Sequence, residues 1–246
     1  DFAVTVAKTA LWIAELQMMK ETENIVHMNL DFLALITNAF IVEGNSLQID
    51  WESVVPKYQV SYIMGNPPFV GARVMSSEQK DDVKEIFQGW KNVGNMDYVC
   101  CWYKKCADFM KNTSIRAALV STNSVSQGES VANLWKPLLE NDVHIDFAYR
   151  TFQWDSEAKI KAHVHCVIIG FSIAPYNKPK KIFIDERYQI AKNINGYLLD
   201  AANVYVESRN KPICNIPEMN LKQKNIFARG MDQKNLLIGH RDIVFG

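Results

Sequence analysis

The feature that most constrains this chain is the stretch at residues 62–70, where an apolar run passes into a turn fixed by two prolines. The apolar start is typical of a buried strand. Pro67 and Pro68 fix their own backbone angles and remove two amide donors, but each keeps a carbonyl acceptor. Asn66 adds a side-chain carbonyl, and Phe69 adds a flat apolar face. The sequence therefore predicts a strand that ends in a rigid set of hydrogen-bond acceptors beside an aromatic ring.

This set suits the activation of an amino nitrogen whose lone pair is delocalised into a ring or a carbonyl group. Two acceptors that bind both N–H groups favour a pyramidal nitrogen with its lone pair directed at an electrophile. Phe69 would stack on a planar substrate, as aromatic side chains do around an extruded base. A Pro-Pro turn without any chemistry is the alternative that these residues alone leave open.

The composition is that of a globular protein, with 48% hydrophobic and 22% charged residues in a chain of 246. Because no apolar run approaches the ~20 residues that span a bilayer, and no signal-peptide pattern is present, we expect a cytoplasmic protein without a membrane partner. The 27 basic and 27 acidic residues cancel, which leaves no strong basic field for nucleic acid. The five cysteines lack CxxC spacing, so we expect reduced, mostly buried thiols and no metal site.

Hydrophobic periodicity predicts alternating helices and strands. Helices are expected at 1–19, 76–90, 96–110 and 129–140, with a shorter helical or loop segment at 30–40, and strands at 40–42, 60–64, 115–123, 144–152, 162–173 and 182–184. The strands at 144–152 and 162–173 suit a long hairpin. This order predicts an α/β fold with a mostly parallel, doubly wound sheet and an antiparallel strand at one edge.

The pattern changes after residue 175, where a basic, proline-bearing connector at 178–181 precedes a segment with little periodicity. We therefore expect a catalytic domain at 1–175 and an extension at 176–246. The polar stretch at 43–47 follows the strand at 40–42. It is expected at the ligand-facing edge of the sheet, because sites in open α/β sheets lie beyond the carboxyl ends of strands.

Asn66-Pro67-Pro68-Phe69 resembles motif IV of amino-methyltransferases that use S-adenosylmethionine, above all the N6-adenine DNA methyltransferases. Further blocks resemble one subfamily, the MmeI-like single-chain bacterial restriction-modification enzymes. These blocks cover most of residues 1–173 in the family's order and lie at 65–71, 94–99, 120–129, 150–159 and 164–171. The resemblance implies the Rossmann-like sheet of class I methyltransferases, with the hairpin as its reversed edge. It also implies methyl transfer to adenine N6 in double-stranded DNA with a flipped adenine.

The resemblance also implies roles for individual residues. Asn66 and the Pro67 carbonyl would bind the adenine amino group, and Phe69 would stack on the flipped base. The cofactor's adenine would meet motif III, which falls on Asn45, Ser46 and Leu47, although many relatives carry aspartate at the first position. Weaker expectations are a second aromatic wall from Phe152 or Trp154 and phosphate contacts from Arg150, Lys159 and Lys161.

The family's glycine-rich cofactor loop has no counterpart here, because the eleven glycines form no GxG. We therefore expect a fragment whose sheet lacks its first two strands, which binds the cofactor weakly or not at all and is inactive alone. The family's nuclease and cofactor-loop part would precede residue 1. Most of the target-recognition part would follow residue 246.

Other patterns compete with this interpretation. Asp146 with Glu157-Ala158-Lys159 imitates a magnesium nuclease site, but the pattern is short and the block belongs to the methyltransferase hairpin in the family. His163 and His165 share one strand face without a third ligand, which favours hydrogen-bonded histidines. The alternative functions are methylation of RNA adenine or of protein glutamine, and a non-catalytic DNA-binding or scaffolding module.

Overall fold

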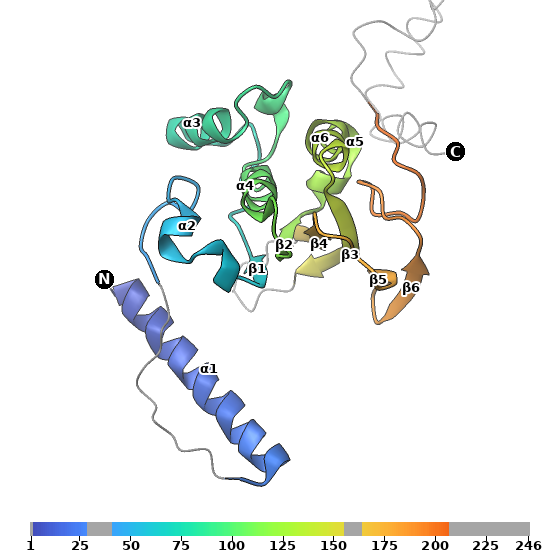
Figure 1. Ribbon diagram of the computed structural model, residues 1–246. Helices are drawn as coiled ribbons and strands as arrows, with labels where there is room; N and C mark the ends of the chain where they lie inside the picture. Colours follow the sequence, from blue (N-terminus) through green and yellow to red (C-terminus); the bar gives the residue numbers. More distant parts are fainter. Residues whose placement is uncertain (1, 29–40, 155–163, 207–246) are drawn as a thin grey trace, which may run out of the picture. The chain divides into compact units, whose positions relative to one another are not determined.

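The computed structural model describes residues 2–28, 41–154 and 164–206 (Figure 1). The longer helices are α1 (Phe2–Val26), α3 (Ser77–Ile86) and α4 (Cys100–Met110). Short helical elements are α2 (Trp51–Val54), η1 (Lys57–Gln59), η2 (Val93–Asn95), η3 (Asn123–Ser126), α5 (Gly128–Ser130), the π-helical η4 (Val131–Trp135) and α6 (Lys136–Glu140). The strands are β1 (Tyr62–Gly65), β2 (Arg116–Thr122), β3 (His144–Trp154), β4 (Val164–Ser172), β5 (Lys180–Ile184) and β6 (Arg187–Ala191). No helix in these described ranges is long and apolar enough to cross a membrane.

The strands form one sheet in the order β1-β2-β4-β3-β5-β6 (Figure 1). β1 pairs with β2 and β3 pairs with β5 in parallel, whereas the other three pairings, β2 with β4, β3 with β4 and β5 with β6, are antiparallel. The predicted α/β class and the β3–β4 hairpin are confirmed. The prediction of a mostly parallel sheet with its reversed strand at an edge differs from this mixed sheet. β4 lies inside because it pairs with β2 on one side and with β3 on the other, and β5 then extends the sheet beyond β3.

The sheet thus continues beyond residue 176, where the sequence places a domain boundary. β5 and β6 both belong to it, and β5 pairs directly with β3 from the preceding segment. The division into 1–175 and 176–246 stays a prediction.

The predicted strand at 40–42 is wrong for Ile41 and Val42, which adopt no strand, and Phe40 lies outside the described residues. A strand needs a neighbour for its backbone hydrogen bonds. β1, at one edge of the described sheet, pairs there with β2 alone. Residues 41–44 instead lead into a tight turn that begins at Asn45. The helical segment expected at 30–40 also lies outside the described residues.

The core lies on one face of the sheet, against α4 and η4. Tyr103 of α4 is fully buried, shares a 2.5 Å hydrogen bond with Ser121 of β2 and stacks on Phe171 of β4 at 5.2 Å between ring centroids. Trp135 of η4 meets Tyr103 edge-on at 5.3 Å. These large apolar surfaces fix the position of α4 over the strands whose carboxyl ends carry the site.

The expectation that the apolar run of β1 is a buried strand is wrong, because one face of β1 is exposed. Side chains alternate between the two faces of a strand, and Tyr62 and Met64 share the face away from the core. They are 70% and 81% exposed, whereas Ile63 between them is half-buried. The apolar run is therefore a strand, as predicted, but it is not a buried one in the described structure.

Local signals in the sequence agree well with the helix starts. The helix expected at 76–90 begins as α3 after Ser76, which caps it and forms a capping box with Gln79. The cysteines at 100, 101, 106 and 166 are free and buried, which confirms the prediction for these four, and Cys214 lies outside the described residues. The helix expected at 129–140 is present as α5, η4 and α6, with a π-helical middle.

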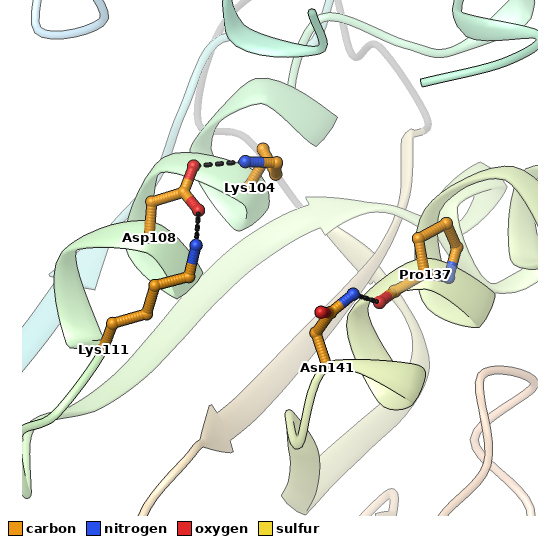
Figure 2. A network of polar contacts seen from close by, with 5 residues as sticks. All are labelled: Lys104, Asp108, Lys111, Pro137 and Asn141. Atoms are coloured by element: carbon orange, nitrogen blue, oxygen red, sulfur yellow. Dashed lines mark hydrogen bonds and ion pairs between the residues drawn. The ribbon is translucent and has the colours of Figure 1, made fainter. Parts of the chain in front are cut away.

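Two surface contacts illustrate how the outer sides of α4 and α6 are stabilised (Figure 2). Asp108 of α4 forms ion pairs with Lys104 in the same helix and with Lys111 directly after it. At the end of α6, the Asn141 side chain donates a 2.7 Å hydrogen bond to the Pro137 carbonyl. Both contacts lie outside the turn at 45–49 and the loop at 66–72, so Asp108 and Asn141 offer control substitutions for the site described next.

Candidate active site

The loop at 66–69 leaves β1 at its carboxyl end, where ligand sites of open α/β sheets lie. Pro67 is buried and Phe69 is half-buried, whereas Asn66 is exposed. Within the described ranges the Asn66 side chain has no hydrogen-bonding neighbour. The structure thus presents the Asn66 amide to solvent beside the packed Pro67, as a group that binds an incoming ligand requires.

The end of this loop is tied to the segment before α4 by a pair of neighbouring residues, Asp97 and Tyr98. The Tyr98 N–H donates a 2.9 Å hydrogen bond to the Val70 carbonyl. The Ala72 N–H donates to Asp97 Oδ1 at 3.3 Å. The second Asp97 oxygen accepts hydrogen bonds from Ser124 and, at 3.5 Å, from Thr122 Oγ1. Asp97 therefore joins the loop after β1 to the polar exit of β2.

The residues expected to meet the cofactor form a tight turn. The Asn45 carbonyl accepts hydrogen bonds from the N–H groups of Gln48 and Ile49 at 2.9 and 3.0 Å. The Asn45 side chain closes the turn, because its Oδ1 accepts from the Leu47 N–H at 3.0 Å. Asn45 is exposed, Ser46 is half-buried and Leu47 is 5% exposed. The turn is a preformed unit with one exposed corner.

Three side chains from α2 and α4 hold this turn. Trp51 Nε1 donates to the Ser46 carbonyl at 2.8 Å, and Trp102 Nε1 donates to Ser46 Oγ at 3.1 Å. Lys105 Nζ donates 2.7 Å hydrogen bonds to the carbonyls of Leu47 and Ile49. Burial lowers the pKa of Lys105, partly offset by Asp50 and Glu85. The Ser46 and Leu47 groups named here are engaged within the fold, so Asn45 is the part of the turn most open to a ligand.

A buried carboxylate that the sequence analysis missed lies at the centre of this arrangement. Asp82 of α3 is 5% exposed and accepts hydrogen bonds from Asn45 Nδ2 and Gln48 Nε2 at 2.9 Å each, and from Tyr98 Oη at 2.5 Å. Burial alone raises the pKa of Asp82, but these hydrogen bonds outweigh it and bring the pKa below the ordinary 3.8. Burial and the neighbouring Asp82 raise the pKa of Tyr98 well above its usual range. Asp82 is therefore an ionised carboxylate next to a neutral phenol.

Helical spacing could have identified Asp82. It precedes Val83 and Ile86, which form the apolar side of α3, and it is itself one of the two buried residues of that helix. A carboxylate at such a position needs partners. The sequence does not show which ones, because they are 16 to 37 residues away along the chain.

Tyr98 connects the turn at 45–49 with the loop at 66–72. Its hydroxyl reaches Asp82, which holds Asn45, while its backbone N–H holds Val70. The structure thus links the two predicted sites, for cofactor and for amino group, by a short series of hydrogen bonds.

The predicted second aromatic wall belongs to the same edge of the sheet. β1, β2 and β3 run in one direction, since β4 is antiparallel to both β2 and β3. Cys166 of β4 lies opposite Thr122 on one side and Phe152 on the other. Two strand spacings separate Phe152 from Thr122, roughly 10 Å. Trp154 ends β3 and Arg150 is half-buried on it, whereas Lys159 and Lys161 lie outside the described residues.

Asp146, the carboxylate of the competing nuclease pattern, lies near the start of β3, away from that edge. It is buried, its Oδ2 accepts a 2.7 Å hydrogen bond from Ser172, and its Oδ1 lies 3.4 Å from His144 Nε2. Its supposed partners Glu157 and Lys159 fall outside the described residues, as does His163, and His165 is exposed. Across the described part of the chain, no group of three potential metal ligands occurs.

An apolar cavity of about 370 Å³ lies beside the turn, lined by Ser46, Ile49, Trp51 and their neighbours. Neither Asn66 nor Phe69 lines it. This cavity is therefore separate from Asn66 and Phe69, the residues predicted to hold the flipped base.

Comparison with known proteins gives the following matches. Residues 1–184 match the family model of the MmeI DNA-methyltransferase domain. DNA methyltransferase A of Bacillus subtilis (strain 168) is 40% identical over 222 residues, which cover 89% of this chain and 25% of that protein. The solved structure of the Type IIL restriction-modification enzyme MmeI in complex with DNA is similar, with a TM-score of 0.76 and 36% identity over 89% of this chain. The present chain spans 25% of the first relative and 32% of the second.

Proposed function

This chain belongs to the family of MmeI DNA-methyltransferase domains, and from that membership we propose that the protein carrying it methylates adenine N6 in double-stranded DNA as part of a bacterial restriction-modification system. The observation that carries the proposal is the Asn66–Phe69 loop at the carboxyl end of β1. Its asparagine amide is exposed and has no hydrogen-bonding neighbour among the described residues.

In the proposed reaction the chain supplies acceptors and a stacking surface. The Asn66 side-chain oxygen and the Pro67 carbonyl accept the two N–H groups of a flipped adenine, which directs the nitrogen lone pair outward. Phe69 stacks on the base, and Phe152 or Trp154 covers its second side. We assign phosphate contacts to Arg150, Lys159 and Lys161.

S-adenosylmethionine, when bound, would supply an electrophilic methyl group and leave as S-adenosylhomocysteine, and the proton that the amino nitrogen gives up would pass to solvent. Asn45 fits a role in holding its adenine. The amide is fixed by Leu47 and Asp82, yet its oxygen keeps a second lone pair and its nitrogen a second N–H. Ser46 and Leu47 complete the turn that presents Asn45. The buried negative charge of Asp82 lies directly behind this amide, which strengthens its oxygen as an acceptor for the adenine amino group.

The test uses the full-length protein that contains this sequence. It is incubated with methyl-labelled S-adenosylmethionine and bacterial DNA, and the DNA is digested to nucleosides. We expect label in N6-methyldeoxyadenosine, and loss of that label in Asn66→Ala. Asn141→Ala, which removes an exposed side chain that only binds the Pro137 carbonyl (Figure 2), is the matched control and retains activity.

Other outcomes would change the assignment. Parallel incubations contain bacterial RNA or protein in place of DNA. Label in RNA adenine or in protein glutamine, with DNA unlabelled, would replace the substrate but keep the site. If the full-length protein does not bind S-adenosylmethionine and transfers no methyl group, this result would favour a non-catalytic DNA-binding or scaffolding role.

A further inference from the structure

We propose that Asp97 is a positioning residue for methyl transfer, which fixes the Asn66–Phe69 loop against the exit of β2 without touching substrate or cofactor. This inference rests on the proposed function. It assigns a role to a residue that lies outside the motif itself.

The contacts of Asp97 leave little room for another role. One carboxylate oxygen accepts from the Ala72 N–H at 3.3 Å, and the other accepts from Ser124 and from Thr122 at 3.5 Å. Asp97 is only half-buried, but both oxygens point to protein groups. The Thr122 and Ser124 hydroxyls also share a 2.7 Å hydrogen bond with each other. A carboxylate engaged in this way by groups from two segments is a good anchor.

Asp97 connects two parts of the site whose relative position matters for the reaction, the loop after β1 and the end of β2. Ala72 lies three residues after Phe69, and Tyr98, next to Asp97, holds the Val70 carbonyl at 2.9 Å. Thr122 ends β2 and lies opposite Cys166 of β4. Cys166 in turn lies opposite Phe152 of β3. Asp97 therefore sets the distance between the loop that would bind the adenine amino group and the edge that carries the second aromatic wall.

Loss of such an anchor has a specific kinetic consequence. The loop remains attached to β1 at one end, so the site still forms, but its acceptors occupy a wider range of positions. Displacement of a catalytic group by about 1 Å lowers the rate of a positioned reaction by roughly 100-fold. The rate of transfer should therefore fall, while the affinity for the cofactor, which we assign to the Asn45 turn, should not.

Three variants of the full-length protein separate positioning from charge. Asp97→Ala removes the acceptor for the loop and for the hydroxyls together. Asp97→Asn keeps an oxygen for the Ala72 N–H and offers its own N–H to the hydroxyls, so it should rescue the site. Ser124→Ala removes one partner on the β2 side and leaves the Ala72 contact. Asp108→Ala, which removes two ion pairs of α4 outside the site (Figure 2), is the matched control.

The first readout is the single-turnover rate of adenine methylation, with the dissociation constant of S-adenosylmethionine measured in parallel. We expect a rate loss of about 10- to 100-fold in Asp97→Ala, a smaller loss in Ser124→Ala, recovery in Asp97→Asn, and cofactor affinity within about twofold throughout. An unchanged rate in Asp97→Ala would overturn the proposal. Equal losses in Asp97→Asn and Asp97→Ala would also overturn it, because they would assign the effect to charge.

The second readout does not depend on activity. Amide hydrogen exchange at residues 66–74 should accelerate in Asp97→Ala and remain as in the wild type in Asp97→Asn and Asp108→Ala. Slow exchange of these amides in Asp97→Ala would contradict the anchor even if the protein methylated no DNA. If Asp97→Ala does not fold, amide hydrogen exchange in Ser124→Ala is the deciding measurement. We expect faster exchange than in the wild type only at residues 66–74 and 122–126. A wild-type protein without methylation activity would instead remove the proposed function, which keeps the two failures distinguishable.

Discussion

Tyr98 Oη donates a 2.5 Å hydrogen bond to the buried carboxylate of Asp82, and this contact connects the Asn45 turn with the Asn66–Phe69 loop. The Tyr98 backbone holds Val70 at the same time. One residue thus holds a loop through its backbone and a turn through its side chain. Its hydroxyl can be removed without disturbing the backbone contact.

Tyr98→Phe tests the side-chain half of this connection. The change leaves Asp82 buried with one fewer donor, and a hydrogen bond to a charged group is worth about 1.5–3 kcal/mol. We expect the free energy of unfolding, measured by urea denaturation, to fall by that amount and the affinity for S-adenosylmethionine to fall with it. Tyr188→Phe is the control because the Tyr188 side chain is 57% exposed, and it should change stability by less than about 0.5 kcal/mol.

An exchange of side chains tests whether Asn45 and Asp82 act as a pair. Asn45→Asp alone places two carboxylates at the 2.9 Å contact and should destabilise the protein by about 1–3 kcal/mol. The double variant Asn45→Asp with Asp82→Asn restores one charge and one amide and should recover more than half of that loss. Denaturation of both single variants and the double variant gives the coupling between the sites. Additive losses would show that the two side chains act independently.

The pKa of Asp82 predicts a specific acid sensitivity. Because the folded-state pKa lies below the ordinary 3.8, Asp82 contributes stability above pH 3.8 that is lost as the pH falls through the folded value. Asp82→Asn should be less stable than the wild type at pH 7, and the difference should shrink below about pH 4. Unfolding free energies at pH 7, 5, 4 and 3 would show this convergence. A constant difference over that range would contradict the assignment.

Asp146 should behave in the opposite sense. Burial raises its pKa, although Ser172, His144, Arg116 and Lys180 partly offset the shift. The folded state therefore binds the proton more tightly than the unfolded state, and stability is lost as the pH rises from the ordinary 3.8 through the raised value. Asp146→Asn keeps an acceptor for the Ser172 hydroxyl and should be at least as stable as the wild type at pH 7. Asp142→Asn, at an exposed position, is the control. The prediction would be contradicted if Asp146→Asn were less stable than the wild type at pH 7 while Asp142→Asn was not.

The local part of the fold was accessible from the sequence. The helix expected at 76–90 and the hairpin of the strands at 144–152 and 162–173 depend on patterns among neighbouring residues, and both are present, as α3 and as the β3–β4 pair. The strand expected at Ile41 and Val42 is wrong, because two apolar residues do not determine a strand without a partner. The exposure of Met64 was missed for a related reason, since the sequence of β1 does not show what covers its second face.

The candidate site shows the same limit. The Asn66–Phe69 loop was identified because proline and asparagine chemistry is local, and it does lie at the carboxyl end of a strand. Asp82 and Asp97 were not identified, because their partners come from other elements, up to 37 residues away for Asp82 and 27 for Asp97. Carboxylates on or near helices normally face solvent, and only the tertiary structure shows that these two bind the loops of the site.

The most direct test of the central claim is the N6-methyldeoxyadenosine content of DNA from cells that lack other adenine methyltransferases and produce the full-length protein. Wild type and Asn141→Ala should accumulate the modified base, whereas Asn66→Ala, at equal protein level, should leave the DNA at background. Modified adenine at wild-type levels in Asn66→Ala would contradict the assignment of the Asn66–Phe69 loop as the site of methyl transfer.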